Sequence, residues 1–273
     1  MQNSQNLIET PNLSGVPNLK QLILQGCTAL SKIHPSLGNL KQLIRLDLSG
    51  CKFLKSLPHK INLESLEVLD LSGCSRLKKL PEIVGNMSRL SKLSLHGCNV
   101  LSPTRSNKLL SFSLMQRSPD PMGMLTHTLS GLSSLTDLNL SYCNLQTVPD
   151  AIGSLTFLNY LNLKGNNFIC LPKNIIRLSN LYTLFLSGCK DLLSLPELPL
   201  NIKYFEAEGC TSLETLPLRP EDVFNPHLYL INCVKLIDNQ GFSDMFLTML
   251  ARYIQVSLSV CVSISVSVSL AKF

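Results

Sequence analysis

Cysteine and histidine are the residue types of this sequence that could bind a metal, form disulfides or act in catalysis. The chain has 273 residues, with 10 cysteines and 5 histidines. The histidines fall in different segments, at His34, His59, His96, His127 and His227. There is no C-x-x-C pair, no H-E-x-x-H and no G-x-S-x-G in the sequence. The sequence therefore predicts neither a metal site nor an enzyme active site.

Most of the cysteines recur at a regular interval instead. The separations are 24, 23, 24, 45, 23, 23, 21 and 23 residues, for Cys27, Cys51, Cys74, Cys98, Cys143, Asn166, Cys189, Cys210 and Cys233. Most of them follow an L-x-x-L-x-L segment, as in LIRLDLSGC and LYTLFLSGC, and most are followed by Leu or Val and then Pro. A period of about 20–29 residues with this motif is the signature of leucine-rich repeats.

The motif also predicts the elements that position the cysteines. Because side chains alternate along a strand, the two leucines of each L-x-L face the core and the flanking residues face outward. Segments such as VPDAIGSLTFL carry Pro at the start of a short helical turn. We therefore expect an α/β leucine-rich repeat solenoid, a right-handed horseshoe with about eight or nine parallel strands on its concave face, each centred on L-x-L. Pro196 and Pro199 predict an extended arm in place of a helix.

The repeated cysteine indicates the redox environment of the protein. Adjacent strands lie about 4.8 Å apart, so equivalent cysteines in successive repeats come near disulfide distance. Folding in an oxidising compartment would risk wrong cross-links, and free, buried thiols suit the cytoplasm or the nucleus. We expect each cysteine to cap its strand from inside as a small apolar residue with a weak S–H donor, where Asn166 offers an amide.

The pattern divides the chain into six segments. In order they are a partial repeat, leucine-rich repeats, an inserted loop or degenerate repeat, further leucine-rich repeats, a C-terminal capping helix and a low-complexity Ser/Val tail, at residues 1–18, 19–100, 101–130, 131–236, 237–255 and 256–273. The first segment predicts a chain that starts within the solenoid. The capping helix has apolar residues at helical spacing, and the alternating tail predicts a strand prone to aggregation.

Charge and hydropathy exclude other classes of partner. The net charge is +6 at pH 7, and the Lys and Arg residues are spread through the repeats without forming a stripe. The sequence therefore predicts no nucleic-acid partner. The amino terminus, MQNSQNLIETP, has no basic region followed by an apolar run, so we expect no secretory signal and no membrane association.

The repeats resemble the leucine-rich repeat region of plant intracellular immune receptors of the TIR, nucleotide-binding, leucine-rich repeat type, the group of the tobacco mosaic virus resistance protein. The resemblance covers residues 6–255 and is carried by segments such as GVPNLKQLILQGCTALSKIHPSLGNLKQL and SLPELPLNIKYFEAEGCTSLETLP. It implies a role in the defence response: the repeats recognise a pathogen effector or a guarded host protein, and they hold the nucleotide-binding domain of a full-length receptor inactive. The chain has no G-x-x-x-x-G-K-[ST] loop and no segment long enough for a TIR domain. We therefore expect a truncated form without a cofactor.

Large aromatic residues at outward strand positions predict the binding site. They fall in four successive repeats, at Tyr160, Phe185, Tyr204 and Tyr229. Earlier repeats have charged or small residues at the same places, namely Arg45, Asp47, Asp70, Lys92 and Ser94. Exposed aromatics tend to mark interaction sites, although aromatics also favour strands in general. Glu206 and Glu208 beside them favour a basic partner, with Lys164 as a local counter-charge.

Two other interpretations remain open. The first is an extracellular leucine-rich repeat inhibitor of a cell-wall hydrolase, which the sequons at Asn12, Asn86 and Asn139 favour weakly. The L-x-G-x-I-P sequence of such inhibitors does not follow the repeated Cys or Asn position. The second is a nonfunctional gene fragment, which the sequence alone does not separate from a truncated receptor.

Overall fold

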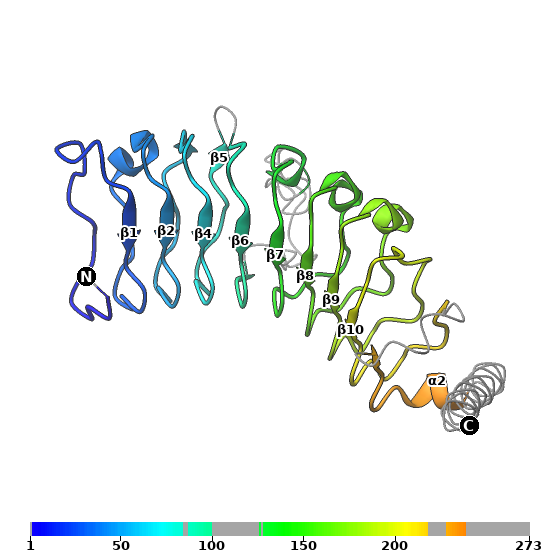
Figure 1. Ribbon diagram of the computed structural model, residues 1–273. Helices are drawn as coiled ribbons and strands as arrows, with labels where there is room; N and C mark the ends of the chain where they lie inside the picture. The colour runs from blue at the N-terminus through cyan, green and yellow to red at the C-terminus, as the bar shows by residue number, and fades with distance from the viewer. Residues whose placement is uncertain (1, 84–86, 100–125, 127, 218–227, 239–273) are drawn as a thin grey trace, which may run out of the picture.

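A sheet of parallel strands, laid side by side in an arc, is the main element of the described structure (Figure 1). The computed structural model describes residues 2–83, 87–99, 126, 128–217 and 228–238. Each of the nine strands pairs with the next, in the order β1 (Gln21–Ile23), β2 (Arg45–Asp47), β4 (Val68–Asp70), β6 (Lys92–Ser94), β7 (Asp137–Asn139), β8 (Tyr160–Asn162), β9 (Thr183–Phe185), β10 (Tyr204–Glu206) and β11 (Leu228–Tyr229). The predicted leucine-rich repeat solenoid of parallel strands is confirmed.

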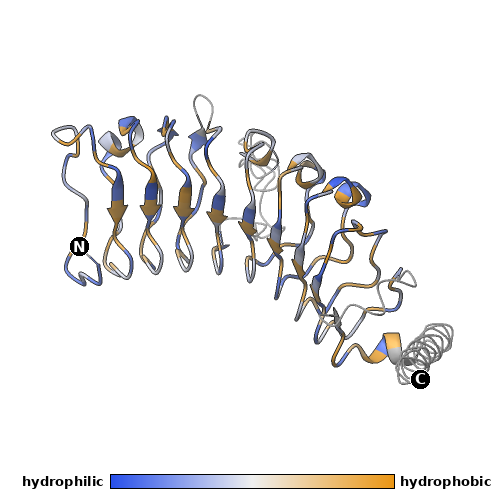
Figure 2. Ribbon diagram, viewed as in Figure 1, coloured by the Kyte–Doolittle hydropathy of each residue, from blue (hydrophilic) through white to orange (hydrophobic). Residues whose placement is uncertain are grey.

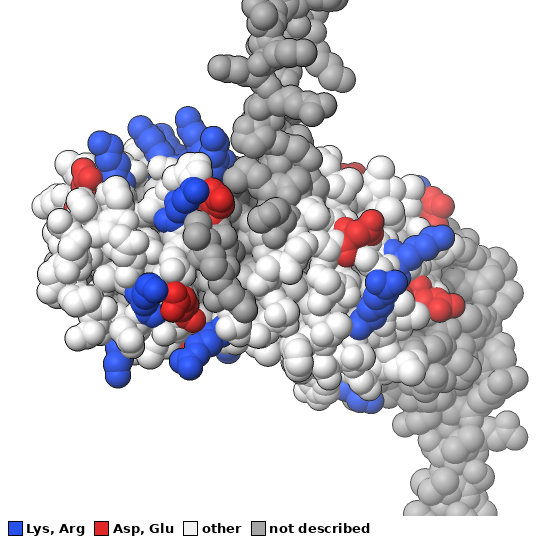
Figure 3. Space-filling view, turned by 90° about the horizontal axis from the view of Figure 1, so that it is seen from above, with Lys and Arg blue, Asp and Glu red and all other residues white. Residues whose placement is uncertain are grey.

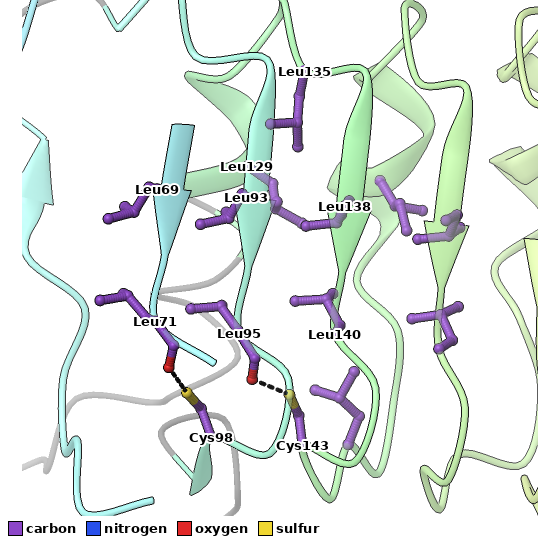
Figure 4. Close-up of a cluster of buried hydrophobic side chains, with 14 of the residues drawn as sticks. Leu69, Leu71, Leu93, Leu95, Cys98, Leu129, Leu135, Leu138, Leu140 and Cys143 are labelled. Atoms are coloured by element: carbon purple, nitrogen blue, oxygen red, sulfur yellow. Dashed lines mark hydrogen bonds between the residues drawn. The ribbon is translucent and has the colours of Figure 1, made fainter. Parts of the chain in front are cut away.

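The strands repeat with leucine in register on leucine. Leu46 of β2 pairs with Leu69 of β4, which pairs with Leu93 of β6. Figure 4 shows the Leu69 and Leu93 side chains lying between neighbouring strands, and Figure 2 shows hydrophobic and hydrophilic residues next to each other in the strands. The second leucine of each L-x-L, such as Leu48, is also fully buried but follows the strand. Strands are thus centred one residue earlier than predicted, because the Leu48 carbonyl accepts the Cys51 N–H of the following turn.

The connections opposite the sheet are of two kinds. Short 3-10 helices are η1 (Pro35–Asn39), η3 (Asp150–Ser154) and η4 (Lys173–Arg177). The last two begin directly after a proline, as predicted. Two other repeats have the paired strands β3 (Lys60–Ile61) and β5 (Glu82–Ile83), where the sequence predicts helical turns. That prediction is wrong because backbone groups there pair with the adjacent repeat, and the Asn62 N–H donates to the Gly38 carbonyl at 2.8 Å. No helix forms at Pro196 and Pro199, as expected.

The ends and the insertion are only partly described. Strands β6 and β7 are direct neighbours, although 45 residues separate Leu93 from Leu138. The chain between them therefore leaves and re-enters the sheet at adjacent positions, and residues 100–125 lie outside the described part. After β11 comes α2 (Val234–Asp238). The predicted capping helix lies outside the described residues beyond residue 238, and so does the Ser/Val tail.

The turn after each strand requires a left-handed residue. Glycine takes this position in most repeats, for example at Gly50 and Gly165, with φ of 74° and 64°. Glycine reaches such φ values without a Cβ penalty. Tyr142 stands at the same place with φ of 56°, and its ring lies edge-on to His96 with 5.5 Å between ring centroids.

The repeated cysteines lie in a row beneath the sheet, and we call them the ladder cysteines: Cys27, Cys51, Cys74, Cys98, Cys143, Cys189, Cys210 and Cys233. Each ladder thiol from Cys51 onward donates to the carbonyl of a core residue in the preceding repeat, as Cys98 does to Leu71 and Cys143 to Leu95, both at 3.0 Å (Figure 4). Every ladder cysteine has 0% exposed surface. The thiol is therefore a second donor to a buried carbonyl, such as that of Leu71, which also accepts the backbone N–H of the cysteine in its own repeat.

Asn166 replaces the thiol with a larger set of bonds. Its Nδ2 donates to the carbonyls of Leu140 and Leu163 at 2.9 and 2.8 Å. Its Oδ1 accepts the N–H groups of Cys143 and Leu145 at 3.2 and 3.0 Å. The amide thus performs the donor role of a ladder thiol and adds an acceptor for two backbone donors, in agreement with the expected equivalence of the two residue types.

Burial raises the pKa of the ladder thiols from Cys51 onward. It raises the pKa of Cys51, Cys98, Cys143 and Cys210 to about 12 and that of Cys189 to about 11. The structure records the nine cysteines of its described part as free thiols, and Cys170 is exposed. Because the thiolate is the reactive form, the ladder should be chemically inert in the folded protein.

Thiol labelling should separate the ladder from Cys170. In a Cys261→Ser variant at pH 8, we expect one thiol to react rapidly with Ellman's reagent and the others at least about a hundredfold more slowly until guanidinium unfolds the chain. The additional change Cys170→Ser should remove the rapid phase. Mass spectrometry after alkylation without reductant provides the redox test, and a disulfide joining Cys51, Cys74 or Cys98 would contradict a reducing environment.

Candidate protein-binding face

The outward side chains of the strands form two columns across the sheet. The first column holds the residue before each central leucine, such as Arg45 in β2 and Val68 in β4. The second column holds the residue after it, such as Asp47 and Asp70. Since paired strands lie about 4.8 Å apart, side chains within a column are close neighbours.

From β2 to β8, most side chains of the second column accept a hydrogen bond from the turn that follows their strand. An Asp or Asn oxygen there accepts the N–H of the residue two positions later, at distances of 3.1, 2.9, 3.1 and 3.1 Å for Asp47, Asp70, Asn139 and Asn162. Short polar side chains make such bonds readily. These positions therefore have a structural role in most of the early and middle repeats.

Asp47 is the most deeply buried of these carboxylates. It is 4% exposed, and its Oδ2 accepts from Arg45 Nη2 at 2.8 Å. Its Oδ1 accepts the Ser49 hydroxyl at 2.7 Å. Burial by itself raises the pKa of the Asp47 carboxyl, but the bonds from Ser49 and Arg45 outweigh it and hold this pKa below its usual value. The charged form is thus the one that the fold favours.

Acid should therefore weaken the early repeats through Asp47. A folded-state pKa below the unfolded value stabilises the protein above the unfolded pKa, and the contribution is lost as pH falls through the folded pKa. We expect the free energy of unfolding to decrease below about pH 4, and Asp47→Asn to lose about 1 kcal/mol less than the parent over that range. Urea unfolding at pH 7 and below pH 4 measures the difference. Equal losses of unfolding free energy in both proteins would show that groups other than Asp47 cause the acid sensitivity.

From β9 onward, larger residues replace the Asp and Asn residues of the second column. Its residues are Phe185, Glu206 and Tyr229, which are neighbours in register. The ring of Phe185 is half-buried and meets Tyr160 of β8 edge-on, with 5.6 Å between ring centroids. Lys164 Nζ lies 4.4 Å from the centroid of the Phe185 ring and forms an ion pair with Glu206. Phe185 is therefore held between an aromatic edge and a cation.

A second aromatic contact lies beside the first. Tyr204 of β10 packs against Tyr182, with 5.4 Å between ring centroids. Tyr182, Tyr204 and Tyr229 are 41%, 37% and 43% exposed, which leaves much of each ring accessible to a partner. Glu208 is exposed and follows the buried Ala207. We call Tyr160, Tyr182, Phe185, Tyr204 and Tyr229 the aromatic patch.

The structure brings some of the predicted site residues together in two groups and adds one residue, whereas Tyr229 is a register neighbour of Glu206 and Glu208 belongs to neither group. Tyr160, Phe185, Lys164 and Glu206 are in contact, and Tyr204 meets Tyr182. Tyr182 was not predicted, because it precedes β9 and does not flank the leucines of the L-x-L segment. The repeated L-x-x-L spacing contains the signal, since Tyr182 follows the first leucine of LYTLFL.

Charge is distributed unevenly along the solenoid. Viewed from the edge that carries η1, η3 and η4, Lys and Arg side chains gather over the N-terminal repeats and thin out toward the C-terminal repeats (Figure 3).

Within the described part of the chain, no three His, Cys, Asp or Glu side chains come together in a way that could hold a metal ion. Among the same residues, no helix is long and apolar enough to cross a membrane.

Comparisons with known proteins agree with this architecture. The family model described as Leucine Rich Repeat matches residues 42–62, 65–87 and 134–155. The chain is 34% identical to disease resistance-like protein DSC1 of Arabidopsis thaliana, over 80% of this chain and 17% of DSC1. It is 38% identical to disease resistance protein RPP2B of the same plant, over 81% of this chain and 21% of RPP2B.

A relative from tobacco matches as well. TMV resistance protein N of Nicotiana glutinosa is 32% identical over 67% of this chain and 14% of that protein. The chain thus spans a small part of each of these relatives, and the matches confirm the expected resemblance. The chain belongs to the leucine-rich repeat family, with repeats related to those of the plant disease-resistance proteins.

Proposed function

We propose that this chain is a non-enzymatic protein-recognition module of a plant intracellular immune receptor, and that the aromatic patch binds its protein partner. Leucine-rich repeats typically present extended surfaces for protein interaction. The observation that carries the proposal is the change in the second column. Turn-closing Asp and Asn residues are replaced there by Phe185, Glu206 and Tyr229, which are not needed to close a turn in that way.

The chemistry of the aromatic patch fits a protein surface. Tyr and Phe contribute large contact areas, and exposed aromatics are enriched in the energetically dominant parts of interfaces. The Lys164–Glu206 pair is partly shielded, with side chains 27% and 28% exposed, so its charges largely compensate each other. Exposed Glu208 adds a negative charge, which favours a partner with a basic rim. The class of partner we propose is a pathogen effector or a host protein that such effectors modify.

The free thiols support a reducing compartment, and we propose the cytoplasm or the nucleus. The extracellular alternative is less compatible with the structure. Asn139, in one of the three sequons, is half-buried in β7, where its Oδ1 accepts the Ser141 N–H at 3.1 Å. A glycan there would disrupt this turn and cover the sheet. A contact with the nucleotide-binding domain of a longer receptor is a second proposed interaction, and it rests on the family resemblance of the repeats alone.

Site-specific photo-crosslinking in plant tissue tests the proposal. The photoreactive amino acid p-benzoylphenylalanine replaces Tyr204 or Tyr229 in the patch, and Phe157 as the matched control. Phe157 is 61% exposed and lies in the turn after η3, away from the aromatic patch. We expect the same protein to be captured from both patch positions during infection and not from the control position. Equal capture at all three positions, or none in the patch, would refute the proposal.

A further inference from the structure

A hollow lies on the sheet beside the aromatic patch, and charged side chains line it together with the apolar residues Val68, Leu69 and Leu93. It has a volume of about 250 Å³ and extends across β4, β6 and β7, with Arg45 at one end and Tyr160 at the other. The hollow forms because the outward side chains between these ends include the short residues Val68, Ser94 and Asn139. Its far end is therefore shared with the aromatic patch through Tyr160.

Two cations, Arg45 and Lys92, and two carboxylates, Asp70 and Asp137, line the hollow, and Asp47 next to the lining adds a third carboxylate as the partner of Arg45. Arg45 pairs with Asp47 at 2.8 Å, and Lys92 pairs with Asp137 at 3.7 Å. Asp70 is the remaining carboxylate, and its Oδ1 accepts the Ser72 N–H at 2.9 Å. No ion pair involves Asp70 within the described part of the chain. One negative charge in the hollow is thus left without a cation.

We propose that this hollow is a subsite for a cationic side chain, in the first place an arginine, of the protein partner that the aromatic patch binds. Asp70 supplies the carboxylate, and the Ser94 hydroxyl, which shares a hydrogen bond with the Ser72 hydroxyl at 2.7 Å, supplies a second acceptor in the same hollow. The Asn139 Oδ1 already accepts the N–H and the hydroxyl of Ser141. A guanidinium has five donors in a planar fork and therefore suits several acceptors at once. The Tyr160 ring at the end of the hollow adds a surface on which a guanidinium can stack. This subsite rests on the proposed function only in that the partner supplies the arginine.

Titration with a capped arginine tests the subsite without the partner. The probe is N-acetyl-arginine methylamide, and its matched control is the citrulline derivative, which has nearly the same shape without the charge. We expect saturable shifts in the amide NMR signals of Ser72 and Ser94 with arginine, weaker shifts with the lysine derivative and none with citrulline. Asp70→Asn should weaken arginine binding by about fivefold or more. An Asn side chain at position 70 can still accept the Ser72 N–H, just as Asn139 accepts the Ser141 N–H at the equivalent position of β7.

A matched variant controls for charge alone. Asp191→Asn removes an exposed carboxylate in the turn after Cys189, outside the hollow. It should leave arginine binding unchanged. Equal binding by the parent and Asp70→Asn, or equal binding of arginine and citrulline, would overturn the proposal. With a partner captured at Tyr204, Asp70→Asn should lower affinity by about fivefold and Asp191→Asn should not. Failure to capture any partner would count against the proposed function and leave the titration result standing.

Discussion

Replacement of Asn166 with alanine should lower the free energy of unfolding by about 3 kcal/mol. The change removes five hydrogen bonds at a site with no exposed surface, including those to the Leu145 N–H and the Leu140 carbonyl. Unpaired backbone groups in a buried site cost more than the bonds themselves contribute. Urea unfolding followed by circular dichroism measures the loss, and amide hydrogen exchange at Cys143 and Leu145 should show reduced protection.

The sequence provides its own matched controls for this experiment. Asn166→Cys restores the donor found in the other repeats but not the acceptor, so it should lose less stability than Asn166→Ala. Cys98→Ala removes one bond, from Sγ to the Leu71 carbonyl, and should cost about 1 kcal/mol. If Asn166→Ala were no more harmful than Cys98→Ala, the additional acceptor bonds would have little energetic value.

Tyr204→Ala should weaken binding of the partner by about 1–3 kcal/mol, which corresponds to a five- to 150-fold lower affinity. Tyr204 is 37% exposed and packs on Tyr182, so its loss removes contact area from the patch with a small effect on the fold. Phe185→Ala should weaken binding to a similar extent. It should also lower stability somewhat, because Phe185 is half-buried between Tyr160 and Lys164.

A control variant separates the effect of the aromatic patch from that of the rest of the surface. Phe157→Ala removes an aromatic side chain that is 61% exposed and lies outside the patch, so affinity should not change. Calorimetric titration with the captured partner gives the affinities, and thermal unfolding identifies any loss of structure. Unchanged affinity in both Tyr204→Ala and Phe185→Ala, together with a loss in Asp47→Asn and Asp70→Asn, would move the binding site to the earlier repeats.

The sequence by itself determined the repeat, the register and the ladder. The spacing of Cys51 and Cys74 carries all three, because each repeat contacts mainly its neighbours and a constant period places equivalent residues side by side. The inward leucines and the aromatic residues at outward positions followed from the alternation of side chains along a strand. A one-dimensional pattern is sufficient for properties that recur in every repeat.

Tertiary structure decided the properties that differ between repeats. The ion pair of Lys164 with Glu206 joins residues 42 positions apart across β8, β9 and β10, and the contact of Tyr182 with Tyr204 joins neighbouring repeats. Likewise, β3 and β5 formed where Pro suggested helical turns, because backbone groups found partners in the adjacent repeat. Such lateral contacts depend on how far successive repeats are offset and on which rotamers the neighbours allow. The period of the sequence contains neither quantity, and so the contacts within the aromatic patch, its additional member Tyr182 and the hollow at Asp70 became visible only in three dimensions.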